Sequence, residues 1–181
     1  MGLNIRVMPK VNSRDELAEL VEIDRWSYKS DPPKVAFEWA ENFPWVYTLL
    51  KRQTKKGWQT MGYGVVIPTD KFILEGLRRG EIGEEDIRKN HIRMPNKADC
   101  FYVASFGTRP NISTYESSRL VGNVTGGILR AQVPVVAVAI TDSGERVARE
   151  VGLTPKPYTS SAFQGIEGYT PKLLEKEPFV F

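Results

Sequence analysis

Residues 98–153 decide the fold and read, in order, ADCFYVASFG (98–107), TRPNISTYESS (108–118), RLVGNVTGGILRAQ (119–132), VPVVAVAIT (133–141) and DSGERVAREVGL (142–153). The first block is an apolar run, the second is a polar loop, and the third has apolar residues at helical spacing. The fourth block is apolar and mostly β-branched, which is typical of a strand covered on both faces. The fifth predicts a helix that ends at a glycine. This order predicts an α/β fold in which a helix joins two parallel, neighbouring strands.

The chain before residue 98 supplies the other predicted elements. Ser13 followed by Glu16 is a capping-box pattern and predicts a helix from there to about residue 28. The remaining elements are a strand within 3–11, a helix at 34–42, a hairpin of strands at 45–52 and 58–68, and a helical segment at 72–79. After residue 153 the pattern weakens, and a last strand is expected near 161–166 or at 179–181.

Length and composition indicate one globular domain, residues 1–181. Apolar residues make up 41% and charged residues 26%, and the net charge of +3 without a clustered basic face speaks against a nucleic-acid partner. Cys100 and His91 are the only residues of their kinds, so we expect no disulfide and no metal. No apolar run approaches the roughly 20 residues needed to cross a bilayer, and MGLNIRVMPK lacks a signal-peptide core. These features predict a cytoplasmic protein without a membrane partner.

The order strand, two helices, hairpin, strand, helix, strand, helix resembles the GNAT N-acyltransferase superfamily over residues 3–153, most strongly from Ala98 onward. Gly152-Leu153 also matches the end of that family's last helix. The resemblance implies a single-domain GNAT-like α/β fold, with a central mixed β-sheet flanked by helices. It places acceptor-side helices at about 13–43, an acyl-CoA-side core at about 98–153 and a C-terminal tail at 154–181.

The resemblance also implies a site for acetyl-CoA, or another acyl-CoA, as co-substrate. In the family the fourth and fifth strands splay apart, and backbone N–H groups of the fourth strand contact the acyl group. Here these are Val103, Ala104 and Ser105. A pyrophosphate would lie on N–H groups at the start of the following helix, where the helix dipole favours anions. The expected contacts there come from Arg109, Asn111, Ser113, Thr114, Ser117 and Ser118.

The phosphate loop departs from the family pattern. That pattern is Arg or Gln, two residues, Gly, one residue, then Gly or Ala. Alignment from Ile112 sets Tyr115 and Ser117 at the small positions, whereas alignment from Arg109 sets Ile112 and Thr114 there. Neither register has the glycines, and the predicted loop is about four residues longer than in the family.

The catalytic acid also departs from the family pattern. Many members carry a Tyr four residues before the closing Gly, and Ala148 occupies that position here. Tyr158, which follows the stiff segment Pro155-Lys156-Pro157, is our candidate for protonating the leaving thiolate. Tyr102 is an alternative donor, and the open candidates for a base are two acidic residues, Asp99 and Glu116.

The sequence therefore predicts an acyl-CoA-dependent N-acyltransferase that moves an acetyl group to a primary amine, on a small molecule or a peptide. Two alternatives stay open: a non-catalytic acyl-CoA or small-molecule binding module, and a phage-type GNAT-like transferase that modifies a nucleobase. A homodimer is also left open. The aromatic residues between Trp26 and Trp45 line an acceptor pocket or fill the core.

Overall fold

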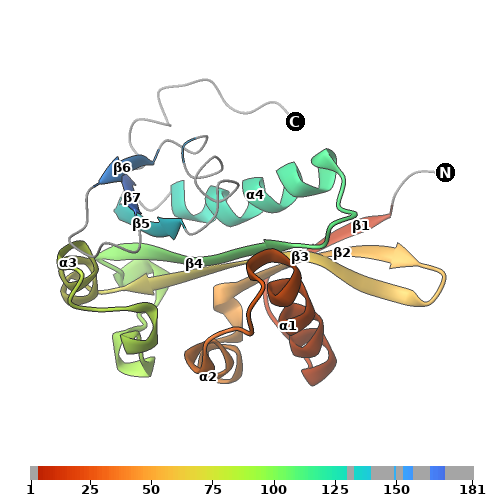
Figure 1. The fold of residues 1–181 in the computed structure, drawn as a ribbon, viewed down its shortest axis with the longest axis horizontal. Helices are drawn as coiled ribbons and strands as arrows, with labels where there is room; N and C mark the ends of the chain where they lie inside the picture. Colours follow the sequence, from red (N-terminus) through yellow and green to blue (C-terminus); the bar gives the residue numbers. More distant parts are fainter. Residues whose placement is uncertain (1–3, 130–132, 140–148, 150–152, 157–163, 170–181) are drawn as a thin grey trace. The chain divides into compact units, whose positions relative to one another are not determined.

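The structure is a computed structural model that describes residues 4–129, 133–139, 149, 153–156 and 164–169 (Figure 1). Its helices are α1 (Arg14–Tyr28), α2 (Lys34–Asn42), α3 (Lys71–Arg79) and α4 (Thr114–Leu129), with short 3-10 turns at Pro44–Val46, Glu84–Asp86, Lys89–His91 and Pro95–Lys97. Its strands are β1 (Ile5–Met8), β2 (Tyr47–Thr54), β3 (Gly57–Thr69), β4 (Cys100–Thr108), β5 (Pro134–Ala139), β6 (Thr154–Lys156) and β7 (Gln164–Tyr169).

The described strands form one mixed sheet in the order β1-β2-β3-β4-β5-β7-β6. The pairs β1–β2, β2–β3, β5–β7 and β6–β7 are antiparallel, whereas β4 and β5 are parallel. β5 lies between β4 and β7, as expected for a strand that is apolar on both faces. The predicted α/β class with a central mixed sheet is confirmed.

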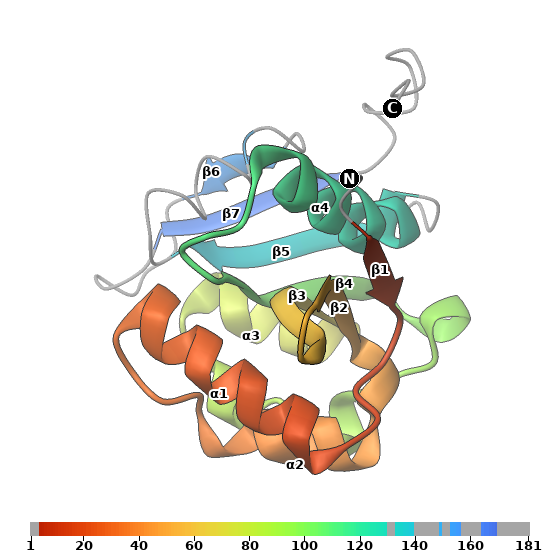
Figure 2. The same cartoon turned by 90° about the vertical axis from the view of Figure 1, so that its right-hand side faces the viewer.

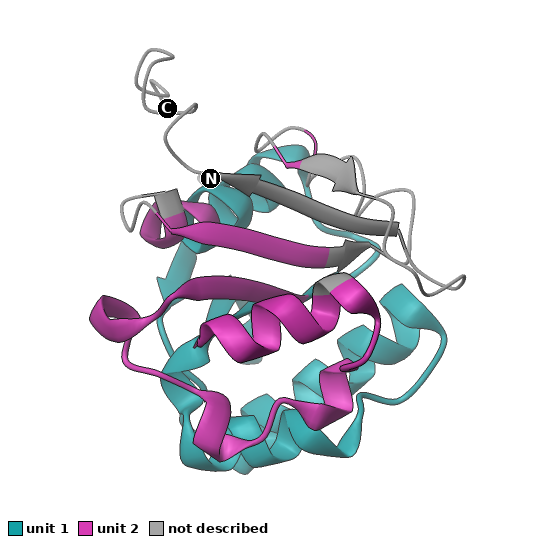
Figure 3. Cartoon of the chain, turned by 90° about the vertical axis from the view of Figure 1, so that its left-hand side faces the viewer, with its two compact units in different colours: residues 1–66, 105–124 teal, residues 67–104, 125–181 magenta. Residues whose placement is uncertain are grey.

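The chain divides into two compact units (Figure 3). Unit 1 comprises Met1–Val66 and Ser105–Val124, and unit 2 comprises Ile67–Ala104 and Thr125–Phe181. β3, β4 and α4 each contribute residues to both units.

Unit 1 is built on two opposite faces of its strands, with α1 on one face and α4 on the other (Figure 2). Leu50 and Met61 pack against Leu120 and Val124 of α4. Gly64 permits this close contact, because a Cβ there would lie 2.6 Å from Val124 Cγ2. The faces of β2 and β3 are therefore buried against helices.

Most elements lie within a few residues of where the sequence predicted them, although β6 (Thr154–Lys156) was not predicted, and the starts of α4 and β2 differ for clear reasons. α4 begins at Thr114 rather than at 119, because Ser113 caps it and the polar residues after it belong to its first turns. The second strand begins at Tyr47 rather than 45, because Pro44–Val46 form a 3-10 turn. Of the helix predicted at 142–153, the structure describes Arg149, which is helical, and Leu153; the other residues lie outside the described part.

Candidate active site

The strand β4 continues beyond its pairing with β5. Phe101–Val103 of β4 pair with Val135–Ala137 of β5, whereas β4 runs on to Thr108. Among the described residues, no β5 pairing extends past Val103. Within the part of the chain that the structure describes, the second half of β4 therefore has an edge that is not paired with β5.

Hydroxyl groups of α1 occupy two N–H groups on that edge. Successive N–H groups of a strand point to alternate sides, and the Arg109 N–H, just after β4, donates to the Met61 carbonyl of β3 at 2.8 Å. The N–H groups of Phe106 and Thr108 therefore point away from β3. They donate to Tyr28 Oη at 3.0 Å and to Ser27 Oγ at 3.2 Å. α1 thus satisfies the edge of β4 where β5 leaves it.

Four side chains of unit 1 form a continuous chain of hydrogen bonds from the protein interior to this edge. Tyr63 Oη of β3 donates to Asp24 Oδ1 of α1, and it lies 2.9 Å from Ser105 Oγ of β4. Ser105 Oγ in turn donates to Tyr28 Oη at 3.2 Å. Asp24 and Tyr63 are buried, with exposed fractions of 6% and 2%, whereas Ser105 and Tyr28 are half-buried. The chain therefore links a buried carboxyl group to partly exposed hydroxyls on β4.

Burial dominates the ionisation of the inner pair. Loss of hydration raises the pKa of Asp24 from its ordinary 3.8 to about 6, although the hydrogen bond from Tyr63 opposes this shift. The pKa of Tyr63 is raised well above its ordinary value, because burial and the neighbouring Asp24 carboxylate both disfavour the phenolate. Asp24 is therefore a carboxyl group that changes charge near neutral pH, which suits a general base.

Gly107 allows α1 to approach β4 closely enough for these contacts. A Cβ at this position would lie 2.8 Å from Tyr63 Cε1 and 2.9 Å from Ile23 Cγ2. Real Cβ atoms rarely approach so closely, so a larger residue would displace Tyr63 or α1.

A buried ion pair organises the loop between β4 and α4. Ser113 and Glu116 form a reciprocal cap, in which Glu116 Oε2 accepts from the Ser113 N–H at 2.9 Å and Ser113 Oγ accepts from the Glu116 N–H at 3.3 Å. Arg52 of β2 donates from both Nε and Nη2 to the Glu116 carboxylate, and from Nη2 to the Asn111 carbonyl at 3.1 Å. Arg52 therefore fixes the loop and the start of α4 together.

Glu116 is fully ionised at neutral pH. The hydrogen bonds from Arg52 lower its pKa to about 2, although the side chain is completely buried. A carboxylate held this firmly is a poor proton acceptor, so Glu116 serves as a structural anion rather than as the base considered from the sequence.

Arg109 faces α1 and β3 in this structure. The register of the β2–β3 pairing shifts between Leu50 and Lys51, which makes Met61 of β3 the extra residue of a β-bulge. Arg109 Nε donates to the Thr60 carbonyl at 2.8 Å, and Nη2 contacts Glu22 Oε2 at 2.8 Å. These contacts tie its guanidinium to the protein, and a role in binding phosphate stays a prediction.

The start of α4 still offers N–H groups to an anion. Among the described residues, the structure records no partner for the N–H groups of Asn111, Thr114 and Tyr115, and all three side chains are exposed. The Ser117 N–H is used within the helix, because it donates to the Ser113 carbonyl at 2.9 Å. Ser117 and the exposed Ser118 thus lie inside α4 rather than in the loop, which runs only from 109 to 113.

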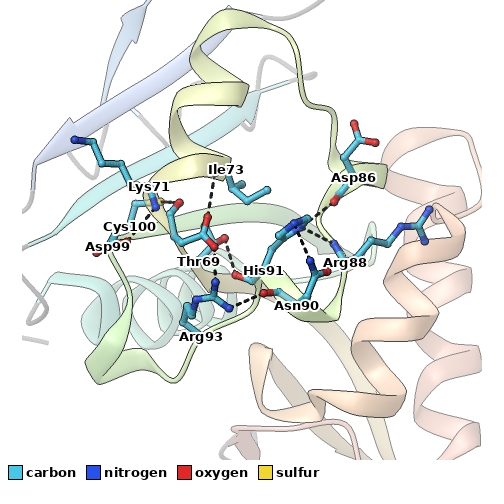
Figure 4. Close-up of polar contacts among 11 residues, drawn as sticks. Thr69, Lys71, Ile73, Asp86, Arg88, Asn90, His91, Arg93, Asp99 and Cys100 are labelled. Atoms are coloured by element: carbon cyan, nitrogen blue, oxygen red, sulfur yellow. Dashed lines mark hydrogen bonds and ion pairs between the residues drawn. The ribbon is translucent and has the colours of Figure 1, made fainter.

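A second polar cluster lies in unit 2, around the start of α3 (Figure 4). Arg93 pairs with Asp70 at 2.6 Å, and Asp99 Oδ2 accepts from the Lys71 N–H at 3.1 Å. His91 Nδ1 lies 3.0 Å from the Asp86 carbonyl, and the buried Cys100 thiol contacts the Asp70 carbonyl at 3.7 Å. These contacts hold loops together, keep the Cys100 thiol buried and give Asp99 a local partner.

The remaining candidate site residues lie outside the described part of the chain or make no contact that points to a function. Tyr158 and Ala148 are outside the described part of the chain. Val103 and Ala104 are half-buried on β4, and Tyr102 is buried. Within the described residues there is no group of three or more potential metal ligands, and no helix long and apolar enough to cross a membrane.

Sequence reasoning missed Asp24, Tyr63 and Arg52, and it considered Tyr28 only as one of the aromatic residues of an acceptor pocket or the core. A signal for Asp24 was readable, because it follows Leu20 by four residues and so lies on the apolar face of α1. The Ser113-x-x-Glu116 capping box was also readable. Tyr63 and Arg52 become functional candidates only through contacts distant in sequence.

No protein-family model matches the chain, and no curated protein matches it. Several solved structures, in contrast, match most of the chain. The loading GNATL domain of CurA from Lyngbya majuscula gives a TM-score of 0.65 at 11% identity, covering 93% of this chain and 99% of that domain. The NatC complex bound to Gag peptide and CoA gives 0.60 at 10% identity, covering 90% of this chain and 95% of the matched chain.

N-acetylglutamate synthase from Neisseria gonorrhoeae, in complex with coenzyme A and N-acetyl-glutamate, gives a TM-score of 0.56 at 10% identity. The match covers 94% of this chain but 36% of the synthase. At these identities the likeness concerns the fold: the chain has the fold of the GNAT superfamily, and the predicted resemblance is confirmed at that level.

Proposed function

We propose that this protein is an acyl-CoA-dependent N-acyltransferase that transfers an acetyl group to a primary amine. The observation that carries the proposal is the length of β4: in a GNAT fold, the strand continues five residues past its pairing with β5 among the described residues, from Ala104 to Thr108. The similar solved structures with bound CoA support a CoA thioester as the co-substrate.

The residues at the start of α4 fit a pyrophosphate. Thr114 and Tyr115 present N–H groups without recorded partners at the positive end of a 16-residue helix. Arg52 balances the negative charge of Glu116 next to them. The proposed contacts are therefore these two N–H groups and that of Asn111, with the hydroxyls of Thr114 and Ser118 beside them, whereas the Ser113 N–H is already used.

The variant Thr114→Pro is expected to weaken acetyl-CoA binding about tenfold or more, because a hydrogen bond to a charged group is worth roughly 1.5–3 kcal/mol. Proline is tolerated at the first position of a helix, so the substitution removes one N–H and leaves α4 intact. Thr114→Ala is the matched control, since it keeps the N–H and removes the hydroxyl. Equal calorimetric affinities for the two variants would exclude this N–H from the site.

When bound, an acyl-CoA supplies a thioester carbonyl open to a nucleophile and a thiolate as leaving group. The protein must polarise that carbonyl, accept a proton from the nitrogen and return one to the thiolate. By the alternation along β4, the Ala104 N–H points away from β3 and is the proposed donor to the carbonyl. Val103 and Ser105 flank it, and Ser105 contributes its hydroxyl.

Tyr158 remains the proposed donor to the thiolate. Tyr158→Phe is expected to lower turnover at least about tenfold, since general acid catalysis contributes about 10²–10⁴-fold, while acetyl-CoA affinity stays constant. Steady-state kinetics and calorimetry on the same preparation check this. Full turnover in Tyr158→Phe would remove this residue from the mechanism.

A second candidate function is a non-catalytic binding module of the same fold. The observation in its favour is that the β4 N–H groups of Phe106 and Thr108 and the loop N–H of Ser113 already have partners within the protein. Titration calorimetry with acetyl-CoA tests what both functions share. Binding is expected in either case, and its absence would contradict the use of any acyl-CoA; the transfer assay then separates catalysis from binding alone.

A further inference from the structure

We infer that Asp24 is the terminal acceptor of the proton that leaves the attacking nitrogen, and that Tyr28, Ser105 and Tyr63 carry this proton to it. The inference rests on the proposed function and adds the base that the sequence did not identify. It follows from the continuous hydrogen-bonded chain between the second half of β4 and the interior of unit 1.

The atoms of the chain allow a balanced transfer. The nitrogen gives its proton to Tyr28 Oη, and the Tyr28 hydroxyl proton passes to Ser105 Oγ. The Ser105 proton passes to Tyr63 Oη, and the Tyr63 proton passes to Asp24 Oδ1. Each hydroxyl breaks one O–H bond and forms another, so all three remain neutral while Asp24 changes from carboxylate to acid. In the structure Ser105 Oγ donates to Tyr28 Oη. The relay therefore requires the Ser105 hydroxyl to turn to Tyr63 Oη and the Tyr28 hydroxyl to turn to Ser105 Oγ, and hydroxyl hydrogens rotate to suit their partners.

Tyr28 is placed to receive the proton. Its hydroxyl oxygen accepts the N–H of Phe106, which belongs to the part of β4 that β5 does not cover. The side chain is half-buried, in contrast to those of Tyr63 and Asp24, so the outer end of the relay is the accessible one.

The charge environment singles out Asp24 among the acidic residues. The structure describes two buried acidic side chains, Asp24 and Glu116, and Arg52 neutralises Glu116. Asp24 has no cationic partner among the described residues: Tyr63 of β3 faces it directly, and Tyr28 of α1 follows through Ser105. Its neighbour Glu22 is already paired with Arg109. Within the described residues, no positive charge therefore offsets ionisation of Asp24, and burial keeps its pKa near 6.

The test combines kinetics with a direct titration of Asp24. In the wild type, kcat/KM is expected to rise with pH around a midpoint near 6, the pKa of Asp24, because the acceptor must be ionised. Ser105→Ala and Tyr28→Phe each break the relay, and we expect turnover to fall about 10²-fold, with acetyl-CoA affinity within about threefold of wild type. Carbon NMR of the Asp24 carboxyl group in the free protein gives the second readout and should show the same midpoint.

Tyr63→Phe moves that midpoint in a defined direction. Removing the hydroxyl removes the hydrogen bond that lowers the pKa of Asp24, so the NMR midpoint is expected to shift to higher pH. The matched control is Tyr47→Phe: Tyr47 is also buried in unit 1, its ring lies 6.4 Å from that of Tyr63, and its hydroxyl donates to the Ala36 carbonyl at 2.6 Å. Turnover and midpoint should both remain at wild-type values in this control.

The outcomes separate the relay from the proposed function. An active wild type with full turnover in Ser105→Ala and Tyr28→Phe overturns the relay alone. A wild type in which Asp24 titrates near its ordinary value, 3.8, also overturns it. A wild type that acylates no amine overturns the proposed function, and the relay with it. Lower turnover in both variants at unchanged affinity, with the Tyr63→Phe shift, supports the relay.

Discussion

Relative to the wild type, the unfolding free energy of the variant Asp24→Asn is expected to rise by about 3 kcal/mol as the pH increases from 3.5 to 7.5. The same variant is expected to lose acyl transfer. The pKa of Asp24 is raised from 3.8 to about 6 in the folded protein, and each unit corresponds to about 1.36 kcal/mol. Between these values the unfolded chain has released the proton while the folded protein still holds it. The contribution of Asp24 to the unfolding free energy of the wild type is therefore fully present below pH 3.8 and is lost as the pH rises through 6. The variant Asp24→Asn loses nothing over this range, because an amide does not titrate.

Urea unfolding of both proteins across this pH range measures the difference. All other groups titrate in both proteins, so their contributions cancel to first order. Asp31→Asn is the control, because Asp31 is exposed and paired with Arg25 at the surface, where such a pair contributes little. Parallel curves for wild type and Asp24→Asn would show that Asp24 is not a buried, unneutralised acid.

Arg52→Ala is expected to cost about 3–5 kcal/mol of unfolding free energy at pH 7, because it leaves the buried Glu116 carboxylate without its cation. It also removes the donor to the Asn111 carbonyl, so the loop before α4 loses its anchor. The pKa of Glu116 is lowered from 4.5 to about 2, so the pair stabilises the fold above pH 4.5, and this contribution disappears as pH falls to 2.

The double variant Arg52→Leu/Glu116→Leu provides the sharper comparison. Replacing both partners with apolar residues removes the buried charge, and most of the stability is expected to return. Arg25→Ala, in the exposed pair with Asp31, is the surface control and should change stability little. Equal stability losses for Arg52→Ala and Arg25→Ala would contradict a structural role for the buried pair.

The sequence predicted the main elements because their signals are local. The β-branched run at 133–141 predicted β5 and its central place, and Ser13 marked the start of α1 through the bond from the Glu16 N–H to its hydroxyl. The start of α4 was placed five residues late, because hydroxyl residues at 113–118 are typical of both a loop and a capped first turn. The loop between β4 and α4 therefore runs only from 109 to 113, which is an ordinary length for a connection between a strand and a helix.

The candidate site was only partly predictable, because its partners meet through tertiary contacts. Ser105 was named for its place on β4, but its hydroxyl bonds depend on α1 and β3. Arg109 was expected to face a phosphate, yet in the structure the carbonyl of Thr60 and the carboxylate of Glu22 hold its guanidinium. A single sequence cannot show which of several acids becomes buried away from a cation; among the described residues, the fold leaves Asp24 in that position.

Mass spectrometry of a primary-amine panel, incubated with acetyl-CoA and the purified protein, tests the central claim most directly. The account predicts that at least one amine gains an acetyl group only when the protein is present, with one free CoA thiol released for each product. It also predicts that this activity falls in Asp24→Asn, although that variant is the more stable protein at neutral pH. The contrary result is acetyl-CoA binding without acylation of any amine, at a protein concentration high enough that even one turnover would be detected. That result would contradict an acyltransferase and would support the non-catalytic binding module instead.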